Sequence, residues 1–203
     1  MRATQYLAGQ FMLEVDSGLN TTASTITPTL ADGSAPGDEA AILARLAELG
    51  IRHETHHHAP VYTVDEAKAE RGELRGSHIK NLFLRNKKGR MWLVTCHEDL
   101  QIDLKSLGEL VGAGRFSFAS AERLMKYLGV IPGAVTPLAV FNDKGGAVQV
   151  ILDEAILNDA VVNVHPLHNA ATTAITPDDL LRFLEAQDHS PTILDMTPFE
   201  KPG

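Results

Sequence analysis

The chain has 203 residues, of which 44% are apolar and 22% are charged, and its net charge is −8 at neutral pH. These values are typical of one globular domain with a full hydrophobic core. The negative net charge argues against proteins that coat nucleic acid non-specifically, because such proteins are normally basic. A local basic stretch is nevertheless present, since residues 71–90 hold seven Lys or Arg and one acid.

The single cysteine, Cys96, excludes a disulfide within the chain and fits a reducing cytoplasm, where we expect the protein. Cys96 ends an apolar strand, so we interpret it as a small core residue rather than a nucleophile. No run approaches the roughly 20 apolar residues that cross a membrane. The first residues also lack the continuous apolar core of a signal peptide.

The first third of the chain predicts a disordered extension at 1–37, a helix at 38–49, a strand at 51–56 and a helix at 63–71. The extension is rich in Thr, Ser, Ala and Gly, which cannot build a core. Asp38 is suited to cap the first helix, and Gly50 to end it. The segment from Thr63 to Glu66 is a capping box, which typically opens a helix.

The stretch from Gly76 to Cys96 predicts a hairpin, with strands at 78–85 and 90–96 joined by a turn at 86–89. Side chains alternate along a strand, so Lys80, Leu82 and Leu84 share one face and Ile79, Asn81 and Phe83 share the other. Both faces carry apolar residues, which indicates a central strand. A lysine there requires an explanation, because a buried ammonium is costly unless an anion meets it.

The remaining chain predicts short strands and helices in alternation. Expected are helices at 103–111, 120–127 and 176–187, strands at 115–119, 160–164 and 171–175, a second hairpin from 137–141 and 147–152, and a tail at 189–203. Strands that come in hairpins favour a mixed sheet. We therefore predict an α+β fold with a mixed, barrel-like central sheet flanked by helices, and one domain spanning 38–188.

Three places in this pattern are candidates for chemistry. Lys80 is either a lysine whose ammonium reaches water or a cation that awaits a phosphate or a carbonyl oxygen. The loop from Gly133 to Pro137 is either a simple turn or a place where exposed backbone N–H groups meet a ligand. His165 ends a strand just before Pro166. It is either a structural residue or a general acid, a general base or a hydrogen-bond donor. The histidines at 53–58 and 165–168 lack the ligand spacing of a zinc site, so no metal is expected.

Taken together, these stretches resemble one family. "HIKNLFLRNKKG" at 78–89, "GAVTPLAVFND" at 133–143 and "VNVHPLHNAATTAI" at 162–175 are similar to the free-standing aminoacyl-tRNA deacylases of the YbaK/ProX type, which are related to the editing domain of prolyl-tRNA synthetase. The third stretch resembles the branch that removes alanine mischarged on proline tRNA. The helix entry "APVYTVDEA" at 59–67 also matches. The resemblance covers about residues 38–188.

The resemblance implies a role for each candidate. Lys80 and His165 would be the catalytic residues, with Lys80 meeting the terminal phosphate or the acyl group. The substrate-binding residues would be Asn81, Gly133, Ala134, Val135, Thr136 and Pro137, with backbone N–H groups near the ester carbonyl. Contacts to the acceptor stem of proline tRNA would come from Lys80, Arg85, Lys87, Lys88 and Arg115. Ile79, Val130 and Val135 are plausible pocket walls.

The resemblance further implies that no cofactor or metal is needed, since the 2′-hydroxyl of the terminal ribose would assist the attack of water on the ester. Prolyl-tRNA synthetase is an additional candidate partner, whereas DNA and membranes are not expected. Three alternatives stay open: removal of serine or cysteine from the same tRNA, a binding module without catalysis, and a metal-dependent hydrolase.

Overall fold

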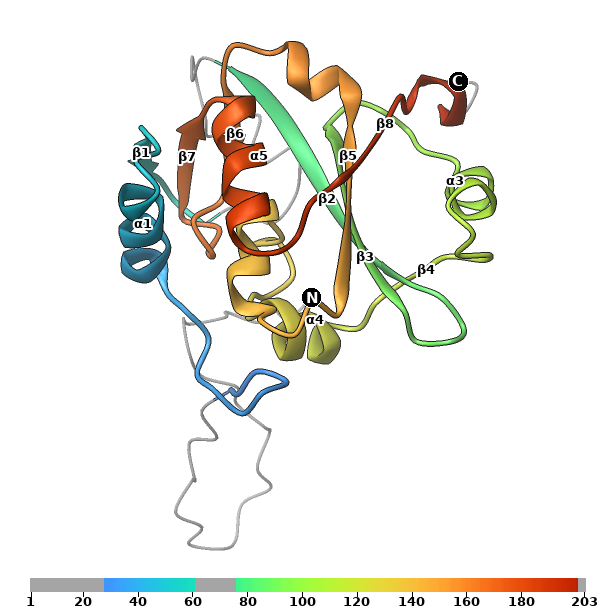
Figure 1. Ribbon diagram of the computed structural model, residues 1–203, viewed down its shortest axis with the longest axis horizontal. Helices are drawn as coiled ribbons and strands as arrows, with labels where there is room; N and C mark the ends of the chain where they lie inside the picture. Colours follow the sequence, from blue (N-terminus) through green and yellow to red (C-terminus); the bar gives the residue numbers. More distant parts are fainter. Residues whose placement is uncertain (1–27, 61–75, 201–203) are drawn as a thin grey trace, which may run out of the picture.

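The structure, a computed structural model, describes residues 28–60 and 76–200 (Figure 1). Residues 1–27 of the expected extension, and the helix expected at 63–71, therefore lie outside the described residues. Within the described part, every helix is too short or too polar to cross a membrane.

A mixed sheet of eight strands forms the centre of the described chain. Its strands are β1 (Glu54–His57), β2 (Ser77–Arg85), β3 (Met91–His97), β4 (Ser117–Phe118), β5 (Val148–Asp153), β6 (Val162–Val164), β7 (Ala171–Ile175) and β8 (Thr192–Leu194). The order is β1-β7-β6-β2-β3-β5-β8, with β4 beside β2. The β2–β3 hairpin is antiparallel, whereas β2 and β6, β3 and β5, and β5 and β8 pair in parallel. The predicted mixed α+β fold is confirmed.

Among the described residues, four α-helices flank this sheet: α1 (Glu39–Glu48), α3 (Leu104–Leu110), α4 (Ala121–Leu128) and α5 (Pro177–Ala186). Each begins after a side chain that accepts a backbone N–H of its first turn, at Asp38, Asp103, Ser120 and Thr176. These are the residues that the sequence predicted as helix starts. Such caps satisfy donors that a helix leaves unpaired at its N-terminus.

Strand β2 divides the molecule into two apolar cores, as its alternating pattern predicted. Phe83 belongs to the larger core, against which Ile79 also packs, under α1, α4 and α5. Leu84 belongs to the smaller core with Trp92, near α3. Trp92 meets Phe116 edge to face, with ring centroids 5.1 Å apart. The two faces of β2 therefore pack against different cores, so its polar residues on opposite faces lie in different surroundings.

The second predicted hairpin is wrong. Residues 137–141 form the 3-10 helix η1 (Pro137–Asn142), and β5 pairs in parallel with β3 instead. The side chain of Thr136 accepts the N–H of Leu138, so it caps η1. Pro137 follows at the first helical position, where its fixed backbone angle favours a helical start.

Both ends of the described chain pack against the domain where the sequence predicted an extension and a tail. Leu30 is buried, and the N–H of Ala31 donates to Lys126 O at 2.7 Å. At the other end, β8 adds an edge strand to β5, and Met196 after it is fully buried. The short 3-10 helices η2 (Glu154–Asn158) and η3 (Thr197–Phe199) complete the described elements.

Candidate functional site

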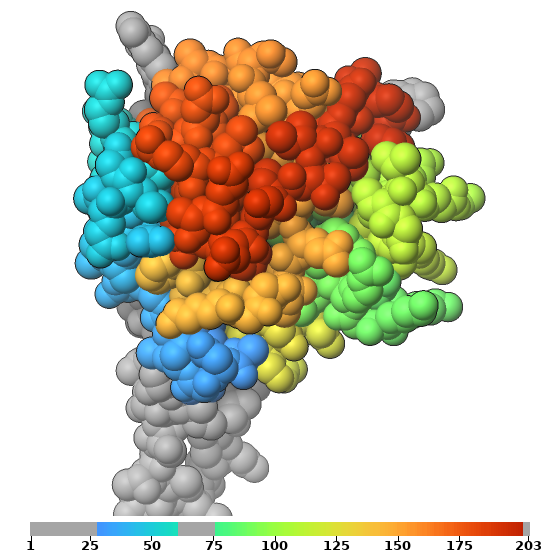
Figure 2. All heavy atoms as spheres, in the orientation of Figure 1, coloured from blue at the N-terminus to red at the C-terminus, as the bar shows by residue number. Residues whose placement is uncertain are grey.

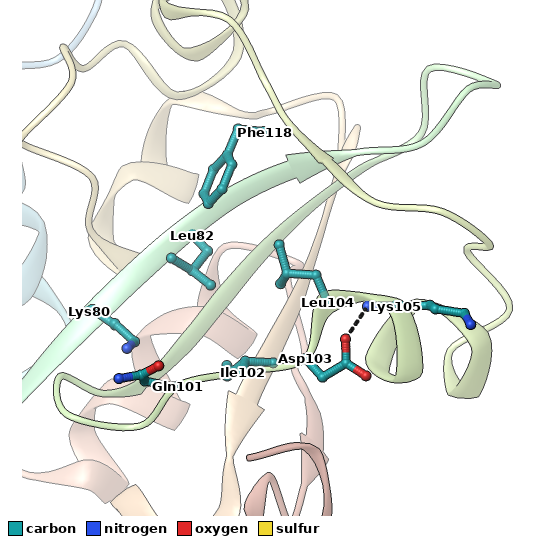
Figure 3. Close-up of a pocket in the computed structure, with 8 residues that line it drawn as sticks. All are labelled: Lys80, Leu82, Gln101, Ile102, Asp103, Leu104, Lys105 and Phe118. Carbon is teal, nitrogen blue, oxygen red and sulfur yellow. Dashed lines mark hydrogen bonds between the residues drawn. The ribbon is translucent and has the colours of Figure 1, made fainter. Parts of the chain in front are cut away.

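A cavity of about 390 Å³ opens on the Lys80 face of β2 (Figure 3). The lining comes from β2, the segment after β3, the start of α3, and β4. It comprises Lys80, Leu82, Gln101, Ile102, Asp103, Leu104, Lys105 and Phe118. Figure 3 shows Leu82 between Lys80 and Phe118, with Leu104 across from them. The residues from Gln101 to Lys105 and Phe118 were not predicted as site residues, because their convergence depends on the fold.

Lys80 is half-buried at this cavity, and its ammonium makes no hydrogen bond or ion pair with any described residue. It lies directly across from Cys96 in the β2–β3 pairing. Cys96 is buried, and burial raises the pKa of its thiol to about 12, although the charge of Lys80 acts in the opposite direction. Cys96 is therefore a neutral core thiol, as predicted, and does not provide an anion for Lys80.

Asn81 lies on the opposite face, where it holds the loop from Gly133 to Pro137. Its Nδ2 donates to Val135 O at 3.0 Å, and its Oδ1 accepts a hydrogen bond from Thr95 Oγ1 at 2.8 Å. The structure thus brings Asn81 and the predicted loop together. It places Lys80 on the other side of the strand, as the alternation of β2 predicted.

The loop itself is shaped by a glycine and a backbone hydrogen bond. Gly133 has a φ of 88°, a conformation that favours glycine. The N–H of Ala134 is occupied by Ile131 O at 3.0 Å. By contrast, no acceptor among the described residues meets the N–H groups of Gly133, Val135 or Thr136.

The expected apolar walls fall into two kinds. Val130 is 1% exposed and belongs to the core, so it does not face an open pocket, and that expectation is wrong. Ile79 and Val135 are half-buried at the margin of the same core. Of the three expected walls, Ile79 and Val135 are therefore the two that can contact a ligand without a rearrangement of the core.

His165 follows β6 and is held by one hydrogen bond from its ring. Its Nδ1 lies 2.9 Å from Ala171 O, and a carbonyl only accepts, so Nδ1 carries the proton. Burial lowers the pKa of His165, with His58 and His168 acting in the same direction against the bond to Ala171. The ring is therefore neutral at neutral pH, and its Nε2 is a hydrogen-bond acceptor.

Strand register relates His165 to Lys80. In the parallel pairing of β2 with β6, His78 lies opposite Asn163. Lys80 and His165 each follow that pair by two residues, so both lie toward the same end of neighbouring strands. Near His165, Glu39 accepts from His57 at 2.8 Å and from His168 at 3.0 Å. No group of three or more His, Cys, Asp or Glu with metal-binding geometry occurs in the described residues.

The predicted basic residues gather around the β2–β3 turn and β4. Lys87, Lys88 and Arg115 are exposed, whereas Arg85 is half-buried and pairs with Ser117 of β4. The turn and α3 project on the same side of the molecule (Figure 2). None of these four side chains makes an ion pair within the described part of the chain. The acids of residues 28–60 and 76–200 therefore do not neutralise these charges.

Residues 58–183 match the model of the aminoacyl-tRNA editing domain. The chain belongs to this family. An editing domain of this family hydrolyses the ester that links an amino acid to its tRNA, so the predicted family and the hydrolase class are confirmed.

Two relatives cover most of this editing domain protein. The Prolyl-tRNA editing protein ProX of Acetoanaerobium sticklandii is 40% identical over 151 residues, which is 74% of this chain and 92% of the relative. The Prolyl-tRNA synthetase associated domain-containing protein 1 of Bos taurus is 42% identical over 161 residues, which is 77% of this chain and 94% of the relative.

A solved structure supports the fold of this editing domain. The crystal structure of a proposed trans-editing enzyme for prolyl tRNA synthetase superimposes with a TM-score of 0.64. The match covers 83% of this chain and 100% of that chain, at 22% sequence identity. The shared fold is thus retained where most residues differ.

Proposed function

We propose that this editing domain acts in trans on proline tRNA that carries alanine, and releases the alanine by hydrolysis of its ester. The observation that carries the proposal is the Lys80 ammonium, which lies half-buried at a cavity without a partner in the described residues. A partly buried cation that no described acid neutralises favours an anionic ligand. A substrate that supplies the anion removes that cost, and the 3′ end of a tRNA is such a substrate.

The edge of β2 offers a route between its two faces. β2 pairs with β6 at Ser77 and His78, and with β4 at Leu84 and Arg85. On this edge of β2, which faces away from β3, residues 79–82 lie between the two pairings and pair with no strand among the described residues. A flexible tRNA end that crosses this open edge would meet Lys80 on one face and the loop held by Asn81 on the other.

The proposed chemistry follows from these positions. Lys80 binds the phosphate of the terminal nucleotide or the acyl group. The N–H groups of Gly133 and Val135, which are half-buried, are candidates to stabilise the carbonyl oxygen as charge develops on it. Water adds to the carbonyl carbon, assisted by the ribose 2′-hydroxyl, and the ester C–O bond breaks. The products are free alanine and the 3′-hydroxyl of the tRNA.

His165 would act in this mechanism through its neutral ring. With Nδ1–H donated to Ala171 O, its Nε2 can accept a hydrogen bond from the substrate. Candidate donors are the ammonium of the amino acid and a hydroxyl of the terminal ribose. We therefore assign His165 to orienting the aminoacyl end, in line with its position at the same strand end as Lys80.

A separate editing site for alanine compensates for the weak exclusion of alanine by the proline pocket of the synthetase. A pocket built for proline excludes a smaller amino acid by only about 1–3 kcal/mol for each missing methylene. A second, smaller pocket can reject proline by its bulk and still accept alanine. The half-buried Ile79 and Val135 are the candidate walls of that pocket.

The proposed tRNA contacts are confined to the acceptor end. The net charge of −8 does not favour diffuse binding of a whole tRNA. Arg115, Arg85, Lys87 and Lys88 would contact the acceptor stem, while Lys80 holds the 3′ end. Prolyl-tRNA synthetase is the candidate protein partner, because it produces the mischarged substrate, and the cytoplasm is the compartment where the two would meet.

The test is a deacylation panel with proline tRNA charged in turn with alanine, serine, cysteine and proline. We expect fastest release of alanine, and no release of proline above spontaneous hydrolysis. Alanine tRNA charged with alanine is the matched control for tRNA choice. Faster release of serine or cysteine would contradict the alanine assignment. Release from none of the four would favour a binding module without catalysis.

A further inference from the structure

Phe118 is an aromatic residue that the fold leaves open to solvent at the cavity. Its exposed fraction is 62%, although it lies in a strand and has a large apolar side chain. It pairs with Leu84 of β2, so it shares the sheet face of Leu84, Leu82 and Lys80. Figure 3 shows its ring beside Leu82, on the wall that faces Leu104.

The charges around Phe118 are complementary to a phosphate backbone. Two lysines, Lys80 and Lys105, line the cavity, and neither side chain has a partner in the described residues. The one lining acid, Asp103, is engaged as the cap of α3 and accepts the N–H of Lys105 at 3.1 Å. Arg115 lies three residues before Phe118 and is exposed.

We propose that Phe118 is a stacking platform for an unpaired base of an RNA 3′ end; this rests on the proposed function, because that function supplies the RNA. Aromatic rings on an open sheet face beside cations are a common way to bind single-stranded nucleic acid, because every base offers a π-face. Phe118 thereby extends the site along β2, away from the ester.

The spacing along β2 indicates which base is stacked. Lys80 and Leu84, the partner of Phe118, are four residues apart, which is about 13 Å at the usual rise of a strand. If Lys80 holds the terminal nucleotide, the base on Phe118 belongs to a nucleotide that precedes it. Arg115 then lies beyond Phe118, toward the double-stranded stem.

The test measures binding of an uncharged acceptor-stem minihelix, so it does not depend on deacylation. One probe carries the unpaired 3′ end, and a second probe is identical but blunt. The variants are Phe118→Ala, Phe118→Leu and Phe118→Trp. The control is Leu110→Ala, which removes a side chain with a similar exposed fraction, 58%, outside the cavity.

We expect Phe118→Ala and Phe118→Leu to weaken binding of the tailed probe about 5- to 150-fold, the range for loss of one stacked base, without changing binding of the blunt probe. Phe118→Trp and Leu110→Ala should bind like the wild type. The proposal is overturned if Phe118→Ala binds the tailed probe normally, or if the wild type does not distinguish the two probes.

The same variants separate this inference from its alternatives. If Phe118→Ala weakens association with prolyl-tRNA synthetase but not with the tailed probe, the ring is a protein contact and the proposal is wrong. If the wild type binds the tailed probe through Phe118 but deacylates no charged tRNA, the stacking platform stands and the proposed function fails.

Discussion

Asn81 Nδ2 donates to Val135 O at 3.0 Å, so one side chain of the central strand β2 fixes the loop from Gly133 to Pro137. Thr95 Oγ1 donates to the other end of the same amide at 2.8 Å. Because a carbonyl oxygen only accepts, Nδ2 must face Val135 O, and rotation of the amide by half a turn would bring two acceptors together and break that bond. The position of the loop relative to β2 therefore depends on the identity of this residue.

Asn81→Asp should impair deacylation by releasing the loop. Aspartate still accepts from Thr95 but has no donor for Val135 O, so the loop carbonyl loses its partner. We expect a loss of about 0.5–1.5 kcal/mol in the free energy of unfolding, the usual net contribution of one hydrogen bond, because both residues are half-buried. The matched control is Thr95→Val, which removes only the Thr95 bond. Equal activity of Asn81→Asp and wild type, measured under single-turnover conditions, would contradict a role of this bond.

Arg115→Ala should weaken deacylation of alanine-charged proline tRNA. Arg115 is exposed and has no ion pair in the described residues, so its charge is available for a base or a phosphate. A bidentate base contact is worth about 1–3 kcal/mol. The measurement compares the full tRNA with a minihelix that copies only its acceptor stem. The control is Arg52→Ala, another exposed arginine. A minihelix that is not a substrate, or an Arg115→Ala variant that matches wild type on both, would rule out this contact.

His189 and Asp143 form a buried pair that should make stability depend on pH. The distance from Nε2 to Oδ2 is 3.1 Å, and the side chains are 3% and 4% exposed. Burial favours a lower pKa of His189, but its hydrogen bonds to Asp143 and Gln187 outweigh burial, and the pKa is raised above 6.5. Protonated His189 therefore stabilises the fold fully below pH 6.5, and this contribution is lost as the pH rises through the raised pKa.

Asp143→Asn tests this pair, because it removes the carboxylate at nearly constant volume. Breaking a buried pair typically costs about 3–5 kcal/mol, so we expect a clear loss in the free energy of unfolding below the pKa of His189. The decrease in stability with rising pH should then flatten. Urea unfolding followed by Trp92 fluorescence measures both effects. As the control, Glu48→Gln breaks the exposed pair with Arg45 and should cost less than about 1 kcal/mol. An unchanged pH profile in Asp143→Asn would show that another group is responsible.

Activity should survive exhaustive chelation. The histidines of this chain lack the spacing of a zinc site, and the proposed chemistry uses the 2′-hydroxyl of the substrate. The measurement is the deacylation rate before and after treatment with a chelator that is then removed. Loss of activity that added zinc restores would support the metal-dependent alternative.

Local signals in the sequence were sufficient for many elements. Asp38, Ser120 and Thr176 each stand just before a helix, because a side chain that accepts a first-turn N–H acts within a few residues. The alternation along β2 likewise predicted which side chains share a face. The pair Thr136-Pro137 carried the same signal as Thr176-Pro177, yet the apolar run after it was interpreted as a strand. Short apolar runs fit either structure, and only the cap distinguishes them here.

Features set by distant contacts could not be predicted in this way. The parallel pairing of β5 with β3, and of β8 with β5, joins segments that carry no local signal of their partner. The cavity likewise arises where the segment before α3 meets β2 and β4, so its lining was missed apart from Lys80. Phe118 carried no such signal, because Phe116, two residues before it in the same predicted strand, is a core residue.

The most direct test of the central claim is the release of alanine from alanine-charged proline tRNA by wild type, Lys80→Ala and Lys144→Ala. Lys144 is an exposed lysine in the turn before β5, and serves as the matched control for loss of one positive charge. The account predicts that wild type and Lys144→Ala release alanine equally, while Lys80→Ala folds normally by circular dichroism and releases none above spontaneous hydrolysis. Full activity of a folded Lys80→Ala variant would contradict it.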